Sequence, residues 1–229
     1  IQLNETNITQ FINNKVILVT GGAGSIGSEI VRQVLKFAPS KVVILDQAES
    51  PLYDLGNELK NKYDASLFEL VIADVSSEQR MRRTFDHFRP HVVFHAAAYK
   101  HVPLMEENPA EAIKVNVLGS KILANLSNEF NVSSFVMIST DKAVNPTNVM
   151  GSSKRIAEMY IQALSKQSKT KFTTTRFGNV LGSNGSVIPL FKKQIENGGP
   201  ITVTDERITR FFMTIPEACQ LVLEAGTMG

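Results

Sequence analysis

Short runs of apolar, often β-branched residues alternate along this chain with segments of helical length. The runs lie at residues 16–20, 42–45, 67–72, 92–95, 135–139 and 172–176. Most of them are too apolar for a strand with one face in water, so we expect strands buried on both faces. Alternation of this kind is typical of right-handed βαβ units. The sequence therefore predicts an α/β fold built on a doubly wound parallel sheet.

The segments between these runs predict the helices that cover the sheet. We expect helices at residues 25–37, 49–62, 78–88, 110–130 and 152–165, of which 110–130 is the longest. Beyond Arg176 the alternation fades into a loop, a helix at 187–197, a strand at 201–204 and a helix from Pro216. We therefore divide the chain into a sheet domain, residues 1–176, and a partial C-terminal substrate-binding region, residues 177–229.

Length, composition and charge exclude several classes of protein. A chain of 229 residues with 43% hydrophobic content can bury a substantial core. Its net charge is +2, and its basic residues are spread along the chain, so no nucleic-acid partner is expected. Its single cysteine, Cys219, excludes an internal disulfide and is read as a buried hydrophobe. The histidines have no metal-ligand spacing, so no metal is expected, and His95 is read as a satisfied core residue.

The first strand runs into a glycine-rich turn, Thr20-Gly21-Gly22-Ala23-Gly24-Ser25-Ile26-Gly27. Three of its glycines would permit a tight turn, close approach of a pyrophosphate, and close packing of the next helix. The N-terminus of that helix would then face the phosphates. An ordinary strand-to-helix turn is the alternative. The strand before, the helix after and Asp46 at the end of the second strand favour a dinucleotide site.

Asp46 also predicts which dinucleotide is bound. It follows Gly27 by about 20 residues, where a carboxylate accepts hydrogen bonds from the adenosine ribose hydroxyls. A 2′-phosphate would meet repulsion there without an adjacent arginine, so NAD is favoured over NADP. Asp74, at the end of the third strand, either accepts from the adenine amino group or serves as a turn residue before a helix.

The order of these motifs resembles the extended short-chain dehydrogenases/reductases, through the glycine turn, Asp74-Val75, Ser139-Thr140 and Lys154. Four stretches resemble, more narrowly, the nucleotide-sugar 4,6-dehydratases of polysaccharide biosynthesis, above all the bacterial UDP-N-acetylglucosamine 4,6-dehydratases. They are HAAAYKHVPLME (95–106), STDKAVNPTN (139–148), RFGNVLGS (176–183) and TRFFMTIPEA (209–218). The resemblance runs from about Asn14 to the end of the chain. It implies a Rossmann-type fold, NAD as cofactor and a UDP-linked N-acetyl amino sugar as substrate.

The resemblance also implies roles for individual residues. Catalytic roles fall on Thr140, Asp141, Lys142 and Lys154. Cofactor contacts fall on Gly21, Gly24, Ser25, Ile26, Gly27, Asp46, Asp74, Val75, Ala96, Ala97, Lys100 and Lys154. Substrate contacts fall on Lys100, Asn116, Arg176, Asn179 and Arg210. The residue types leave alternatives open. Lys100 and Lys154 would otherwise be solvated side chains, and Arg176 and Arg210 would be parts of ion pairs. Asn116 is either a brace for the neighbouring loop or an incidental polar residue in the helix.

The chain departs from the family pattern at Met150. Family members usually carry tyrosine four residues before the conserved lysine, here Lys154. A thioether exchanges no protons, so the usual phenol base is missing, and the resemblance narrows to the subset that carries methionine there. The family also continues past the position of Gly229, and its larger members begin with membrane-spanning helices. We therefore expect a homo-oligomeric, cytoplasmic domain of a protein anchored in the bacterial inner membrane by segments outside this chain.

The implied reaction is loss of water from UDP-N-acetylglucosamine, with hydride moving from C4 to C6 of the sugar. Asp141 would protonate the leaving C6 hydroxyl and Lys142 would remove the C5 proton, which requires a raised pKa for Asp141 and a lowered one for Lys142. Neighbours on a strand point to opposite faces, so the pair must lie in the loop past the fifth strand. A nucleotide-sugar 4-epimerase would use NAD, Thr140 and Lys154 without the pair. A non-catalytic NAD-binding sensor is the other alternative.

Overall fold

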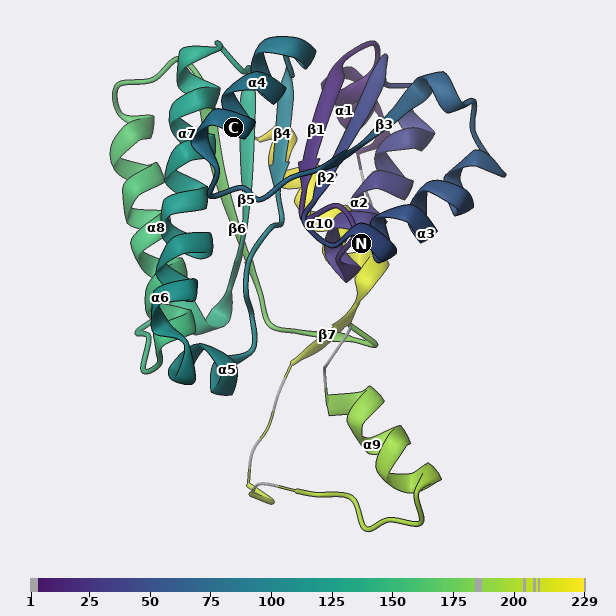
Figure 1. Cartoon of the computed structure of the whole chain (residues 1–229), viewed down its shortest axis with the longest axis vertical. Helices are drawn as coiled ribbons and strands as arrows, with labels where there is room; N and C mark the ends of the chain where they lie inside the picture. Colours follow the sequence, from purple (N-terminus) through teal and green to yellow (C-terminus); the bar gives the residue numbers. More distant parts are fainter. Residues whose placement is uncertain (1–3, 184–186, 204, 208, 210, 229) are drawn as a thin grey trace.

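A single parallel sheet of six strands forms the centre of the chain (Figure 1). The computed structural model describes residues 4–183, 187–203, 205–207, 209 and 211–228. The strands are β1 (Val16–Thr20), β2 (Lys41–Asp46), β3 (Phe68–Ile72), β4 (Val92–His95), β5 (Ser134–Thr140) and β6 (Lys171–Phe177). Their spatial order is β3-β2-β1-β4-β5-β6, so the order reverses between β1 and β4. Open sheets of this kind bind ligands beyond the carboxyl ends of the strands at that reversal.

Alternate residues of the central strands enter two separate cores. On β1, Ile17 and Val19 belong to one hydrophobic cluster, whereas Leu18 belongs to the other. Helices α1 (Glu5–Ile12), α2 (Ser25–Val34), α3 (Glu49–Lys60) and α10 (Ile215–Thr227) supply the first cluster. Helices α4 (Glu78–Phe88), α7 (Ser120–Glu129) and α8 (Val149–Ser165) supply the second. The expected Rossmann-type sheet, covered by helices on both faces, is therefore confirmed (Figure 1).

The helix expected at residues 110–130 has an irregular centre. It consists of α6 (Pro109–Ala112), a π-helical segment η3 (Ile113–Gly119) and α7. A π-turn widens the helix locally, and such turns are often found at functional sites. The sequence expectation of one regular helix is therefore wrong over η3.

The other elements agree less closely with expectation. A 3₁₀ turn, η1 (Leu35–Phe37), ends the first expected helix, and η2 (Ala65–Leu67) precedes β3. Helix α8 begins at Val149 instead of residue 152, because the Asn148 side chain caps it by accepting from the Gly151 N–H. The strand expected at 201–204 is wrong for residues 201–203, which are irregular, and Thr204 lies outside the described residues. The sequence did not reveal α1 or α5 (Val102–Glu107).

The C-terminal region contributes a second, smaller sheet. Strands β7 (Asn179–Leu181) and β8 (Phe212–Thr214), neither of them expected, pair in parallel, and α9 (Val187–Glu196) stands apart from the large sheet (Figure 1). Helix α10 returns to the sheet, where Cys219 and Val222 are fully buried in the first core. Helix α10 therefore packs into the core of the sheet domain, although it follows the boundary placed at residues 176/177 in the sequence. No helix in the described ranges has the length and apolarity needed to cross a bilayer.

Candidate dinucleotide and sugar site

The turn after β1 has the backbone geometry of a phosphate-binding loop. Gly21 has φ +68°, and a Cβ there would lie 2.5 Å from the Ala97 backbone nitrogen. A Cβ on Gly27 would lie 2.0 Å from the Gly21 carbonyl oxygen. Gly24 precedes α2 and offers no side-chain cap to its first N–H groups. Glycine is therefore required at the first and last positions, and the N-terminus of α2, which has no side-chain cap, suits an anion.

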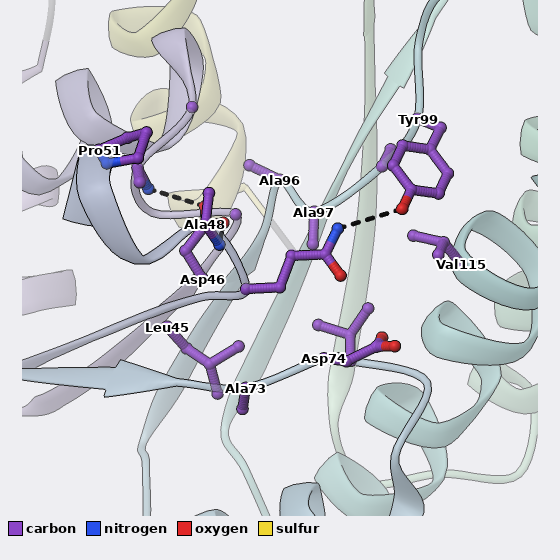
Figure 2. A pocket seen from close by; sticks show the side chains of 16 residues that line it. Leu45, Asp46, Ala48, Pro51, Ala73, Asp74, Ala96, Ala97, Tyr99 and Val115 are labelled. Atoms are coloured by element: carbon purple, nitrogen blue, oxygen red, sulfur yellow. Dashed lines mark hydrogen bonds between the residues drawn. The ribbon is translucent and has the colours of Figure 1, made fainter. Parts of the chain in front are cut away.

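A pocket of about 310 Å³ lies beside this loop at the carboxyl edge of the sheet (Figure 2). The predicted cofactor residues that line it are Gly21, Gly24, Asp46, Asp74, Val75, Ala96 and Ala97. Those that do not line it are Ser25, Ile26, Gly27, Lys100 and Lys154. The residues that sequence reasoning missed are Ala23, Leu45, Gln47, Ala48, Pro51, Ala73, Ala98, Tyr99 and Val115. Most of the missed residues flank the predicted ones at the strand ends, so position on the sheet was the signal that would have found them. Pro51 on α3 and Val115 in η3 reach the pocket from helices and had no such signal.

Two carboxylates stand on the wall of this pocket (Figure 2). Asp46 accepts hydrogen bonds from the backbone N–H groups of Ala23 and Ala48, each at 2.9 Å. Asp74 accepts from the Ser76 N–H at 2.8 Å, which is the turn role that the sequence left open. Burial acts to raise the pKa of Asp74, but the hydrogen bonds from Ser76 and the nearby Lys114 ammonium outweigh it and leave this pKa below its usual value. Both carboxylates are therefore held as acceptors at the pocket.

Tyr99 lies at the opposite wall, and Asn116 fixes its backbone. The Asn116 side chain accepts from the Tyr99 N–H at 2.8 Å and donates to the Tyr99 carbonyl at 3.0 Å. The Tyr99 hydroxyl accepts a hydrogen bond from Gln47 Nε2 at 3.3 Å (Figure 2). Asn116 is fully buried, so the brace is the role that its geometry supports. Lys100, the next residue, is exposed.

Thr140, Asp141 and Lys142 follow the last residues of β5. Thr140 ends the strand, and Asp141 and Lys142 begin a 3₁₀ turn, η4 (Asp141–Ala143), as the proposed chemistry requires. Asp141 Oδ1 accepts from the Thr140 hydroxyl at 2.9 Å and from Lys142 Nζ at 3.1 Å. A Cβ on Gly178, where the chain leaves β6, would lie 3.6 Å from Asp141 Oδ2. The three side chains therefore gather at the same edge of the sheet as the pocket.

The charge state of Asp141 differs from the sequence expectation. Burial acts to raise its pKa, but hydrogen bonds from Thr140 and Lys142, with the Lys142 charge, outweigh burial. The pKa of this carboxyl is therefore below its usual value, whereas a general acid needs a raised one. Half of the Asp141 side chain is exposed, so water still solvates its charge in the free protein.

Lys154 is buried on α8, which excludes the solvated lysine that the sequence left as an alternative. Its exposed fraction is 5%, and burial lowers its pKa to about 8, while the Glu158 carboxylate one turn along the helix acts in the opposite direction. Met150, at the position of the family tyrosine, is also buried and packs in a small cluster with Met105 and Ala112. The Met150 side chain therefore fills space and supplies no proton.

The predicted substrate arginines have different outcomes. Arg176, in β6, forms a two-pronged ion pair with Glu158, to which its Nε donates at 2.8 Å. The ion-pair role that the sequence left open is thus the one seen for Arg176. Asn179 begins β7 and is half-buried. Arg210 lies outside the described residues. Within the described part of the chain, no group of three or more His, Cys, Asp or Glu side chains could hold a metal ion.

Fold and site together define an α/β domain with a dinucleotide pocket and a polar cluster beside it. The chain belongs to the polysaccharide biosynthesis protein family, whose sequence profile matches residues 17–229. The family resemblance that the motifs indicated is therefore confirmed. It is a family of nucleotide-sugar dehydratases and epimerases.

The chain is similar to three curated proteins with different names. The chain is 57% identical to the capsular polysaccharide biosynthesis protein CapD of Staphylococcus aureus, over 100% of the chain and 38% of that protein. It is 36% identical to a UDP-N-acetylglucosamine 4,6-dehydratase (inverting) of Campylobacter jejuni, over 92% of the chain and 63% of the relative. It is also 36% identical to a UDP-glucose 4-epimerase of Rickettsia bellii, over 94% of the chain and 64% of that relative. The chain thus spans only part of the length of these relatives.

Solved structures agree with the fold. The X-ray structure of Pen from Bacillus thuringiensis superposes with a TM-score of 0.88 at 37% identity, over 94% of this chain and 65% of that one. A UDP-glucose 4-epimerase from Thermus thermophilus, solved in complex with NAD, gives a TM-score of 0.75 at 26% identity. This superposition covers 90% of our chain and 72% of the epimerase.

Proposed function

We propose that this chain carries out the NAD-dependent dehydration of UDP-N-acetylglucosamine to a UDP-4-keto-6-deoxy-N-acetylhexosamine, for bacterial glycan biosynthesis. The observation that carries the proposal is the Thr140-Asp141-Lys142 cluster, hydrogen-bonded together directly past β5 and beside the dinucleotide pocket. The name of the Campylobacter relative supports the substrate and the reaction. A homo-oligomer and a membrane anchor outside this chain remain predictions.

The residues present fit NAD. The cradle at Gly21 and Gly27 would be filled by any Cβ, the start of α2 faces it, and Asp46 stands at the ribose position with its charge held by two backbone donors. The NAD complex of the Thermus relative supports the same cofactor. When bound, NAD accepts a hydride from the sugar C4 and returns it to C6. Lys154 would hold the nicotinamide ribose from α8.

The chain's own residues divide the proton transfers between them. Oxidation at C4 makes the neighbouring C5–H acidic, and the Lys142 amine takes that proton. The C6 hydroxyl leaves as water once Asp141 protonates it. Asp141 is ionised in the free protein, and Lys142 Nζ donates a hydrogen bond to it. As the bound sugar displaces the water around this pair, that proton moves from Lys142 to Asp141, which leaves a neutral amine for the C5 proton and a neutral carboxyl for the C6 oxygen. After Lys142 has returned its proton to C5, the proton that the C4 hydroxyl lost on oxidation recharges the amine. The Thr140 hydroxyl, already aimed at Asp141, would hydrogen-bond the oxygen at C4.

A nucleotide-sugar 4-epimerase is the second candidate, because the Rickettsia relative is as similar to this chain as the Campylobacter relative is. An epimerase returns the hydride to C4 and has no hydroxyl to expel, so it does not need the Asp141–Lys142 pair. It ordinarily relies on the tyrosine that Met150 replaces. A non-catalytic NAD sensor would bind the cofactor through Lys154 but would not need the Asp141–Lys142 pair. These residues favour the dehydratase over both alternatives.

Mass spectrometry and NMR of the sugar nucleotide together separate the three functions. Purified protein is incubated with NAD and UDP-N-acetylglucosamine, and Lys142→Ala serves as the matched inactive variant. Loss of one water from the sugar nucleotide is the expected result. A product of unchanged mass and altered stereochemistry would indicate the epimerase, and NAD binding with unchanged substrate would indicate the sensor. Either of these outcomes would contradict the proposal.

A further inference from the structure

His95 lies at the centre of a fully buried chain of hydrogen bonds. Its Nδ1 is 2.8 Å from the Thr20 hydroxyl, and its Nε2 is 2.9 Å from the Ser120 hydroxyl. The Ser120 hydroxyl in turn donates to the Asn116 backbone carbonyl at 2.6 Å. All four residues are 0% exposed. The expectation that His95 is a satisfied core residue is confirmed, but its partners join three parts of the site.

Counting protons fixes the tautomer of His95. A serine hydroxyl has one proton, and Ser120 gives it to the Asn116 carbonyl, so its oxygen can only accept from the ring. His95 Nε2 therefore carries the proton and donates to Ser120. Nδ1 is then unprotonated and accepts the Thr20 hydroxyl proton. Each group has one direction of donation, so the chain has a single arrangement.

Asn116 connects this hydrogen-bond chain to the Tyr99 wall of the pocket and to helix α8. Its side chain donates to the Ser153 hydroxyl at 3.0 Å, in addition to its two bonds with the Tyr99 backbone. Ser153 completes the chain by donating to the Met150 carbonyl at 2.7 Å. Asn116 and Ser120 lie four residues apart, so both point to the side of this helix that faces His95 and Tyr99. Thr20 immediately precedes the phosphate loop, and Ser153 immediately precedes Lys154.

Charges next to the ring reinforce its neutral state. Burial, together with the nearby Lys154 ammonium, lowers the pKa of His95 to about 3. Glu158, the carboxylate that acts on Lys154, also lies on α8. The groups that β1 and α7 turn toward the ring are the hydroxyls of Thr20 and Ser120. A protonated ring would lose its acceptor at Nδ1 and would stand beside a second buried cation.

We propose that His95, as its Nε2–H tautomer, and Asn116 are positioning residues that hold the phosphate-loop strand, the Tyr99 wall of the pocket and the Lys154 helix in one arrangement. The inference rests on the proposed dinucleotide site and does not depend on the dehydration step.

Nitrogen NMR of the histidine side chains tests the tautomer directly. In ¹⁵N-labelled protein, one ring is expected to show protonated Nε2 and unprotonated Nδ1, unchanged from pH 5 to 8. His95→Phe assigns the signal by removing it. A ring that is protonated at Nδ1, exchanges between tautomers or titrates in this range would overturn the proposal. None of these readouts requires catalysis, so they remain informative if the protein dehydrates no sugar.

Two serine variants on α7 test whether the network positions the site. Ser120→Ala and Ser127→Ala each delete a fully buried hydroxyl that bonds the carbonyl four residues earlier, and only Ser120 contacts His95. In Ser120→Ala, His95 is expected to shift toward the Nδ1–H tautomer, which donates to Thr20. NAD binding should then weaken about three- to tenfold, the scale of one hydrogen bond. Ser127→Ala should change neither. Equal NAD affinity in the two variants, at equal folded fraction, would overturn the positioning role.

Discussion

The Asp46 carboxylate, at the end of β2, accepts a hydrogen bond from the backbone N–H of Ala23 in the phosphate loop at 2.9 Å. Its other oxygen accepts from the Ala48 N–H, so two donors from different turns hold the negative charge on the pocket wall. A carboxylate held there accepts from ribose hydroxyls and repels a phosphate on the same ribose. One side chain thus ties the loop to β2, and we expect it to select the dinucleotide.

The first prediction concerns this selection. NAD is expected to bind more tightly than NADP, and Asp46→Asn should shrink the preference about tenfold, because it removes one charge–charge repulsion of the order of 1 kcal/mol while keeping the side-chain size. Dissociation constants for both dinucleotides measure the effect. Asp64→Asn, which alters a capping carboxylate in the turn before β3, is the control and should leave the ratio unchanged. Equal affinities in the unmodified protein would contradict the assignment.

Met150 and Lys154 should respond differently to substitution. Met150→Leu keeps the volume of a buried apolar side chain, so it should cost less than about 1.5 kcal/mol of stability and retain measurable turnover. Lys154→Ala should lose most activity. Steady-state rates at saturating substrate make the comparison. If Met150→Leu were as damaged as Lys154→Ala, the thioether would have a role that its packing with Met105 does not explain.

The Arg176–Glu158 ion pair should contribute to stability. Glu158 is 5% exposed, so Arg176→Ala removes one of the two arginines paired with a nearly buried carboxylate and leaves Arg155. We expect a loss of about 1–3 kcal/mol in the free energy of unfolding, measured by urea denaturation. Arg82→Ala breaks an exposed pair with Glu129 and should cost much less, because water already solvates both charges. Equal losses would show that burial of Glu158 adds nothing.

Lys154 should also make stability depend on pH in the alkaline range. Its pKa is about 8 in the folded protein against 10.5 for the ordinary side chain, so the unfolded chain binds more protons between these values. Stability from this group should therefore rise from about pH 8 to 10.5, by a total of about 3 kcal/mol, and be lost again as the pH falls through 8. Urea denaturation of the unmodified protein and Lys154→Met should show that difference. Lys60→Met, at an exposed position, should show no such pH dependence. If the difference in unfolding free energy between the unmodified protein and Lys154→Met did not change with pH, it would contradict the burial of Lys154.

Regular periodicity explains which parts of the fold could be predicted. β1 and β4 are apolar along most of their length and are bounded by polar or turn residues, so their ends agree with expectation. The π-turn at η3 has no signal in the apolar pattern of residues 110–130, and the partners of its buried Asn116 lie on other elements, which periodicity does not reveal. β7 and β8 are three residues each and depend on each other for pairing, so neither has a pattern of its own.

The site was predictable where the motif determines position. Strand ends place Asp46, Asp74 and the Thr140 cluster at one edge, and sequence order alone gives that result. The charge states and ion pairs of the site residues were harder to predict from the sequence. The lowered pKa of Asp141 depends on which way its neighbours point, and the pairing of Arg176 with Glu158 depends on how α8 lies against β6.

The transfer of hydrogen within one bound sugar tests the proposed dehydration most directly. UDP-N-acetylglucosamine deuterated at C4 is incubated with the protein and NAD in ordinary water, and the product is analysed by NMR and mass spectrometry. The deuterium is expected to appear at C6, and in heavy water C5 is expected to gain a solvent deuteron. Lys142→Ala should lose the C5 exchange, whereas Asp141→Asn should chiefly impair expulsion of the C6 hydroxyl. Loss of the C4 label to solvent, or its return to C4, would contradict the account.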